Sequence, residues 1–90
     1  SYVAFSYLTD DVATLSIDGV APKDENVTTN KWTIWAYEHM YTKSQPKELT
    51  KEFLEYILSD DVQNNIVGEL GYIPVSKMEV ERDWEGNIVK

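Results

Sequence analysis

Cysteine is absent from this 90-residue chain, and histidine and arginine occur once each, as His39 and Arg82. Without cysteine there can be no disulfide, no thiolate zinc site and no cysteine nucleophile. The four glycines are scattered and do not form the Gly-rich turn at a helix N-terminus that cradles phosphate groups. No apolar run approaches the roughly 20 residues that a membrane-spanning helix needs. These shortages exclude most of the common motifs for catalysis, metal binding and nucleotide binding.

Positive charge is also scarce. The net charge is -8, from 16 acidic residues against eight Lys and Arg. Nucleic acid and anionic membranes are bound by clustered cations, so neither is an expected partner. Capture of a small anion stays possible, because such sites use local backbone amides and one or two cations. The hydrophobic fraction of 42% is typical of a folded chain, and the length allows one domain at most.

Three stretches favour extended structure. Residues 31–43 are the most aromatic and are interpreted as a central strand, and shorter strands are expected at residues 1–8 and 12–17. Asp18-Gly19 is a turn signal. Because the chain opens directly in strand-like sequence at Ser1, we expect it to be part of something larger.

Helical signals flank the central stretch. A short helix is expected at residues 22–27, where Pro22 suits a first turn and the acids that follow suit the helix dipole. Two consecutive amphipathic helices are expected at residues 47–58 and 60–70, with Asp60 and Gln63 spaced as in a capping box. Gly71 is a plausible C-cap, and an extended segment and a surface strand or loose acidic tail should follow. The apolar stripes expected to be buried are Leu49, Phe53, Tyr56 and Ile57 in the first helix and Val62, Ile66, Val67 and Leu70 in the second.

Two constellations could carry chemistry. Glu38 and His39 could act as a carboxylate–histidine base in a small hydrolase, but adjacent strand residues point to opposite faces and no partner nucleophile is visible. The aromatic residues Trp32, Trp35, Tyr37 and Tyr41 could stack on a sugar or base, although packing in a core or against another lobe is commoner. In a strand, Tyr37 and Tyr41 share a face. We therefore predict no catalytic residue, no metal ligand and no cofactor.

Five blocks of sequence, taken together, carry a resemblance. The chain closely resembles the C-terminal part of the phosphate-binding proteins of phosphate ABC transporters. The match rests on the order and spacing of these blocks, which extend across nearly the whole chain. The five blocks are Ser16–Pro22, Glu25–Val27, Met40–Lys43, Phe53–Ser59 leading into Asp61–Gln63, and Gly71–Pro74.

The resemblance implies an α/β fold: a fragment of the two-lobed periplasmic-binding-protein (type II) fold, with short strands and two consecutive helices. Residues 1–30 would end the second lobe and start the crossover. Residues 31–76 would form the returning strand and the C-terminal helices of the first lobe, and residues 77–90 an acidic tail. The family's phosphate contacts resemble stretches that would lie upstream of Ser1, so no phosphate-binding residue is predicted in this chain.

The function implied is that of a non-enzymatic, extracytoplasmic protein, either a cell-surface lipoprotein or periplasmic, that delivers inorganic phosphate to a membrane permease. An alternative from the residues alone is an autonomous protein–protein interaction module with an aromatic surface. Strands without their usual neighbours have open edges, so the chain by itself is expected to form a homodimer or to exchange strands.

Overall fold

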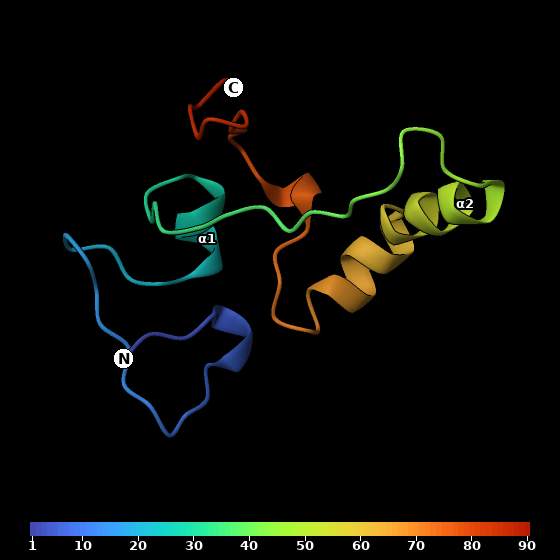
Figure 1. Cartoon of the computed structure of the whole chain (residues 1–90). Helices are drawn as coiled ribbons and strands as arrows, with labels where there is room; N and C mark the ends of the chain where they lie inside the picture. Colours follow the sequence, from blue (N-terminus) through green and yellow to red (C-terminus); the bar gives the residue numbers. More distant parts are fainter.

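The computed structural model describes all residues, 1–90, and contains short helices joined by long irregular segments (Figure 1). The elements, in chain order, are the 3-10 helix η1 (Phe5–Tyr7), α1 (Asp24–Thr28), α2 (Glu48–Ile57), the π-helical segment η2 (Val62–Val67) and the 3-10 helix η3 (Val75–Lys77). There is no strand; the only β-pairing is two isolated antiparallel bridges, Ile17 to Val20 and Arg82 to Ile88.

Helix α1 confirms the short helix expected at residues 22–27. Asp24 and Glu25 occupy its first turn, where negative charge interacts favourably with the helix dipole. The hydroxyls of Thr28 and Thr29 both donate to the carbonyl of Glu25, and Asn30 follows with a φ of 63°. A short side chain such as that of Asn tolerates this left-handed conformation, so the helix ends where the chain reaches Asn30.

Helix α2 lies where periodicity predicts a helix, but its apolar stripe is not buried. Leu49, Phe53 and Tyr56 are 77%, 58% and 55% exposed. Figure 1 shows α2 at the far end of the molecule from the N-terminal segment, with no other layer against it. The expectation of a buried stripe is therefore wrong for this chain by itself, because no second apolar surface faces the helix.

The second expected helix forms as η2, with a wider π-helical winding, after a break at Ser59. The expected capping box at Asp60 is wrong: the Ser59 hydroxyl accepts the N–H of Val62 at 3.5 Å, and Gln63 turns elsewhere. Its amide donates to the Ile57 carbonyl at 2.8 Å and accepts the N–H of Val75 at 3.4 Å. Gln63 thus ties η2 both to the end of α2 and to the start of η3.

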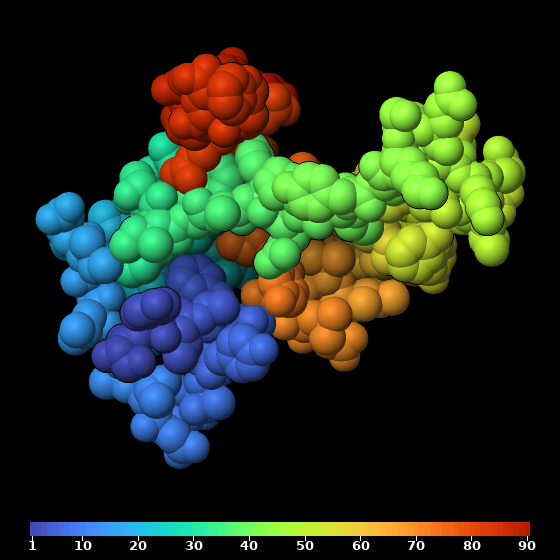
Figure 2. Space-filling view, viewed as in Figure 1, coloured from blue at the N-terminus to red at the C-terminus, as the bar shows by residue number.

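The three expected strands do not form. Residues 1–8 contain η1, and residues 12–17 have no pairing until Ile17. Residues 31–43 run across the molecule as a single unpaired segment (Figures 1 and 2). Because a strand is completed by hydrogen bonds to a neighbouring strand, strand-like sequence without a neighbour stays unpaired. The α/β character expected of the fold is thus not present in the chain by itself.

The turn at Asp18-Gly19 is present as expected. Ile17 and Val20 exchange two backbone hydrogen bonds of 2.9 Å, and Asp18 and Gly19 have φ values of 52° and 79°. Positive φ at both central residues is the pattern of a type I′ turn, which Asp-Gly favours.

The C-terminal residues, where a surface strand or a loose tail is expected, make backbone hydrogen bonds both to α1 and within their own stretch. The N–H of Glu79 donates to the carbonyl of Thr28 at 2.9 Å, which ties this stretch to α1. Beyond it, residues 81–89, here called the C-terminal hairpin, fold back on themselves with a bond from Val89 N–H to the Glu81 carbonyl. Glu81, Asp83 and Glu85 therefore lie on a short hairpin.

Little of the molecule is buried. Only three residues are, Val27, Val62 and Pro74. The accessible surface is 7719 Å², against about 5,400 Å² for a folded monomer of this mass, and the radius of gyration is 15.3 Å, against about 12 Å for a compact domain of this length. Figure 2 shows the resulting open outline, in which α2 and the C-terminal hairpin project from the rest. The chain is folded locally but lacks a core of ordinary size.

Candidate functional site

Four rings line one face of the segment from Trp35 to Tyr41. The centroids of Trp35 and Tyr37 are 5.2 Å apart, those of Tyr37 and His39 6.3 Å, and those of His39 and Tyr41 5.9 Å. Contact between every second residue is the spacing of an extended backbone, in which residues i and i+2 share a face. We call these four residues the aromatic ladder.

The ladder confirms that Tyr37 and Tyr41 share a face and adds Trp35 to it. Trp32 lies apart, with its ring centroid 6.3 Å from that of Phe5. Trp35 and Tyr37 are half-buried, whereas His39 is exposed and Tyr41 is 88% exposed. The ladder is therefore partly covered at one end and open to solvent at the other, and it is not a core within this chain.

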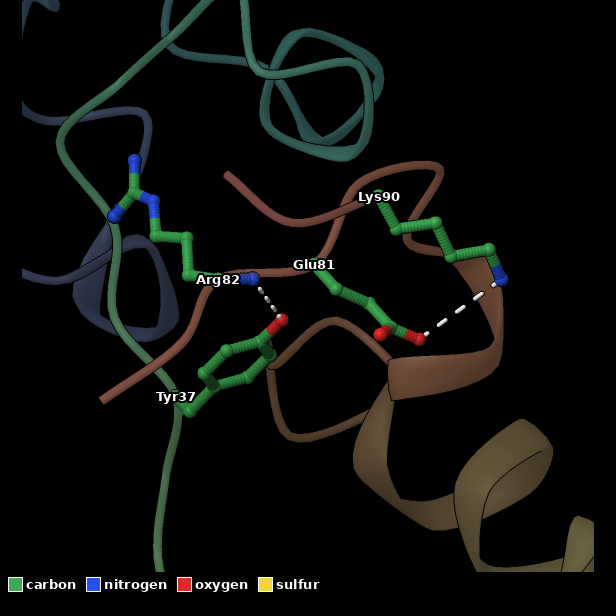
Figure 3. A network of polar contacts seen from close by, with 4 residues as sticks. All are labelled: Tyr37, Glu81, Arg82 and Lys90. Carbon is green, nitrogen blue, oxygen red and sulfur yellow. Dashed lines mark hydrogen bonds and ion pairs between the residues drawn. The ribbon is translucent and has the colours of Figure 1, made fainter. Parts of the chain in front are cut away.

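Arg82 covers the buried end of the ladder. Its guanidinium carbon lies 3.7 Å from the centroid of the Trp35 ring, within the range of a cation–π contact. Its Nη1 donates to the Trp35 carbonyl at 2.7 Å, and its Nη2 donates to the Thr33 carbonyl at 3.0 Å and to Asn30 Oδ1 at 3.2 Å. The backbone N–H of Arg82 donates to the Tyr37 hydroxyl at 3.2 Å (Figure 3). This arrangement, the Arg82 cluster, joins the C-terminal hairpin to residues 30–37.

Asn30 completes the cluster. Its Oδ1 accepts both from Arg82 and from the Trp35 indole Nε1, the latter at 2.9 Å. The same side chain therefore fixes the ring and the cation that lies on it. Sequence reasoning placed Arg82 in the acidic tail and missed this role, because its partners lie 45 to 52 residues away. The one available signal is that the sole arginine occurs in a chain rich in Trp and Tyr.

Glu81, next to Arg82 in the chain, forms the only ion pair of the molecule. Its carboxylate lies 3.9 Å from the ammonium group of Lys90, and both side chains are exposed (Figure 3). A pair at that distance in solvent contributes little. The hairpin is thus held to the rest of the molecule by Arg82 and not by this ion pair.

A cavity of about 440 Å³ opens between α1, the end of η2 and η3. Its charged side chains are Asp24, Glu25 and Lys77. Two carboxylates against one ammonium group do not favour an anion, and α1 is too short to offer a strong dipole. A smaller hollow of about 130 Å³ lies between the Asp18 turn and residues 31–34. The prediction that the chain contributes no phosphate contact is not tested by either cavity and stays a prediction.

Glu38 and His39 are not brought together with a nucleophile. His39 stacks between the rings of Tyr37 and Tyr41 in the ladder, and neither residue makes a side-chain hydrogen bond or ion pair. Nowhere do three or more His, Cys, Asp or Glu side chains gather closely enough to hold a metal ion. No helix has the length and apolar character required to span a membrane.

Comparison with known proteins gives one informative relative. No protein-family model matches the chain. Over 86 residues, 94% of its length, the chain is 57% identical to the phosphate-binding protein PstS of Bacillus subtilis (strain 168). The match lies in the C-terminal part of that protein and covers 29% of it. The resemblance to the C-terminal part of a phosphate-binding protein, expected from five blocks of sequence, is thereby confirmed.

Proposed function

We propose that this chain is the C-terminal part of an extracytoplasmic phosphate-binding protein that serves phosphate uptake by an ABC transporter. The observation that carries the proposal is the 57% identity over 94% of the chain to the C-terminal part of the Bacillus subtilis protein. At that level of identity the two segments share a fold. The chain spans about three tenths of that relative's length, so the activity belongs to the complete protein.

The open structure supports the same proposal. Leu49, Phe53 and Tyr56 of α2 and the outer end of the aromatic ladder are exposed, and the buried residues are only Val27, Val62 and Pro74. A chain that evolved to fold alone would bury such stripes. In the complete protein, two α/β lobes of a periplasmic-binding-protein fold would cover them, and residues 36–41, whose backbone groups make no hydrogen bond here, would gain neighbouring strands.

Within that protein the chain would act as a scaffold. Residues 1–30 would end the second lobe and begin the crossover, residues 31–76 would return into the first lobe, and residues 77–90 would form an acidic C-terminal stretch. Phosphate would be held by upstream residues, because the family's phosphate contacts resemble stretches upstream of Ser1 and the guanidinium of Arg82, the only arginine, is already occupied by Trp35, Thr33 and Asn30. The complete protein would bind phosphate without chemical change and deliver it to a membrane permease, as a lipoprotein or in the periplasm.

A chimeric protein tests this proposal. The matching C-terminal segment of the Bacillus subtilis protein is replaced by this chain, and phosphate affinity is measured by calorimetry. We expect the chimera to bind phosphate within about tenfold of the unmodified protein, a difference of about 1.4 kcal/mol. The isolated chain should show no measurable affinity. A folded chimera that does not bind, or an isolated chain that binds at micromolar concentration, would contradict the proposal.

The alternative function, an interaction module, is favoured by one observation: 20 large apolar residues are exposed, whereas only three residues of the whole chain are buried. In isolation such a surface would be covered by a second copy. Light scattering across a hundredfold range of concentration would give a dimer or larger species under this reading. A monomer throughout that range would remove it.

A further inference from the structure

The contacts of Arg82 follow the geometry of a strand edge. In an extended backbone, carbonyls alternate between the two edges, so those of residues 33 and 35 point the same way. The guanidinium donates to both of them, through Nη2 at 3.0 Å and Nη1 at 2.7 Å. The two N–H groups of one planar side chain thus occupy the positions that donors of a neighbouring strand would take.

The opposite edge is occupied in the same way. The carbonyl of Ile34, which lies between the other two, accepts from the indole Nε1 of Trp32 at 3.1 Å. All three carbonyls of residues 33–35 are therefore bound by side chains. By contrast, no backbone group of residues 36–41 makes a hydrogen bond. The segment is closed to strand pairing over its first part and open over its second.

Two further contacts fix the guanidinium at this edge. Its carbon lies over the Trp35 ring, 3.7 Å from the ring centroid, and Asn30 Oδ1 accepts from Nη2 at 3.2 Å and also from Trp35 Nε1. A lysine could not reproduce this set, because an ammonium group has neither the planar fork nor the stacking face. The arrangement is specific to arginine.

We propose that Arg82 is a positioning residue that closes one edge of residues 33–35 against strand pairing with a second copy of this chain. It does so by holding the C-terminal hairpin across that edge. Natural proteins protect exposed edges by placing charged side chains on them or by covering them. Arg82 places a charged side chain on the edge and also holds the C-terminal hairpin over it. Strand pairing with a second copy is thereby confined to residues 36–41.

The isolated chain tests the proposal through Arg82→Ala and Arg82→Lys, with Lys77→Ala as the matched loss of an exposed cation. Self-association is measured by light scattering, and the state of the cluster by NMR, from the ring-current shift of the Arg82 side chain and the exchange of the Trp35 indole proton. We expect Arg82→Ala to tighten self-association about fivefold or more and to speed indole exchange about tenfold, the factor that a lost charge-assisted hydrogen bond gives. Arg82→Lys should resemble the alanine variant, and Lys77→Ala the parent chain.

A second variant tests the proposal even if Arg82→Ala unfolds the chain. Asn30→Asp preserves a short side chain that tolerates positive φ and gives Arg82 a charged acceptor, so the cluster should tighten and self-association should weaken about two- to fivefold. Asn64→Asp, at an exposed position without a side-chain hydrogen bond, controls for the added charge. Equal self-association in the Asn30 and Asn64 variants, or in Arg82→Ala and the parent chain, would overturn the proposal.

Discussion

Gly71 lies directly against Ser6: a Cβ atom at Gly71 would come within 2.6 Å of the Ser6 Cα and 2.9 Å of its Cβ. Gly71 also has a φ of 89°, which L side chains rarely adopt. The turn after η2 is therefore fixed by two independent requirements, a left-handed backbone and the close passage of the N-terminal segment.

The first prediction is that Gly71→Ala destabilises the chain. The strained φ costs about 1–3 kcal/mol, and the Cβ must in addition displace the backbone at Ser6. Urea unfolding followed by circular dichroism measures the free energy of unfolding. Gly68→Ala is the control, because Gly68 has a φ of -64° and open space around it, so alanine there should stabilise by about 0.4–1 kcal/mol. Equal effects of the two substitutions would contradict the close approach of Gly71 to Ser6.

The second prediction concerns pH and the C-terminal hairpin. The pKa of the Asp83 carboxyl lies below its ordinary value of 3.8, chiefly because the backbone N–H of Asn87 donates to it at 2.9 Å. Desolvation of the carboxyl raises the pKa and opposes this effect. The Asn87 side chain and the N–H groups of Glu85 and Gly86 lower the pKa further. Because the folded pKa is the lower one, the contribution of Asp83 to stability is present above pH 3.8 and is lost as pH falls through the folded pKa.

We therefore expect the amide signals of Glu85 and Asn87 to be constant from neutral pH down to about pH 4 and to move toward disordered values below it. An NMR titration follows both signals. Asp83→Asn should remove the transition, and Asp61→Asn, whose carboxylate accepts from a single side-chain amide, should leave it in place. A transition that persists in Asp83→Asn would assign it to another carboxyl.

Local chemistry made parts of this fold predictable. The Asp18-Gly19 turn, α1, α2 and the turn at Gly71 depend on neighbouring residues, and the sequence placed each within a few positions. The strands were not predictable in this way, because pairing needs a partner far along the chain or outside it. Side chains of residues 35–41 still alternate between two faces as in a strand, which the aromatic ladder shows, but residues 31–43 are not part of a sheet.

The candidate site was predictable only in its rings. The sequence placed Tyr37 and Tyr41 on one face, but Trp35 was added to that face only by the structure, and Arg82, which contacts Trp35, lies 47 residues further along the chain. No rule of sequence spacing relates two residues that far apart. A single arginine among acidic residues likewise does not predict a contact between Arg82 and Trp35. The burial of the α2 stripe failed for a related reason: periodicity identifies an apolar face but not what covers it.

The third prediction is that His39→Ala has no effect on function. The His39 ring lies between the rings of Tyr37 and Tyr41, and its side chain makes no hydrogen bond or ion pair. The chimera with the Bacillus subtilis protein should bind phosphate with unchanged affinity after this substitution, as measured by calorimetry. Glu38→Ala is the companion variant. If either one abolished a hydrolytic activity of the chain, the enzymatic reading would be restored.

The last prediction tests what covers α2. Phe53 is 58% exposed here, so Phe53→Ala should change the free energy of unfolding of the isolated chain by less than about 0.5 kcal/mol. In the chimera, where the upstream lobes are present, the same substitution should cost about 3–5 kcal/mol, because a buried Phe leaves a large cavity when it is removed. Glu52→Ala, on the polar face of the same helix, should be nearly neutral in both. Urea unfolding of the four variant proteins and their two parents gives the comparison. A small effect of Phe53→Ala in the chimera would mean that the upstream part of the protein does not cover this stripe, and a large effect in the isolated chain would mean that a second copy already does.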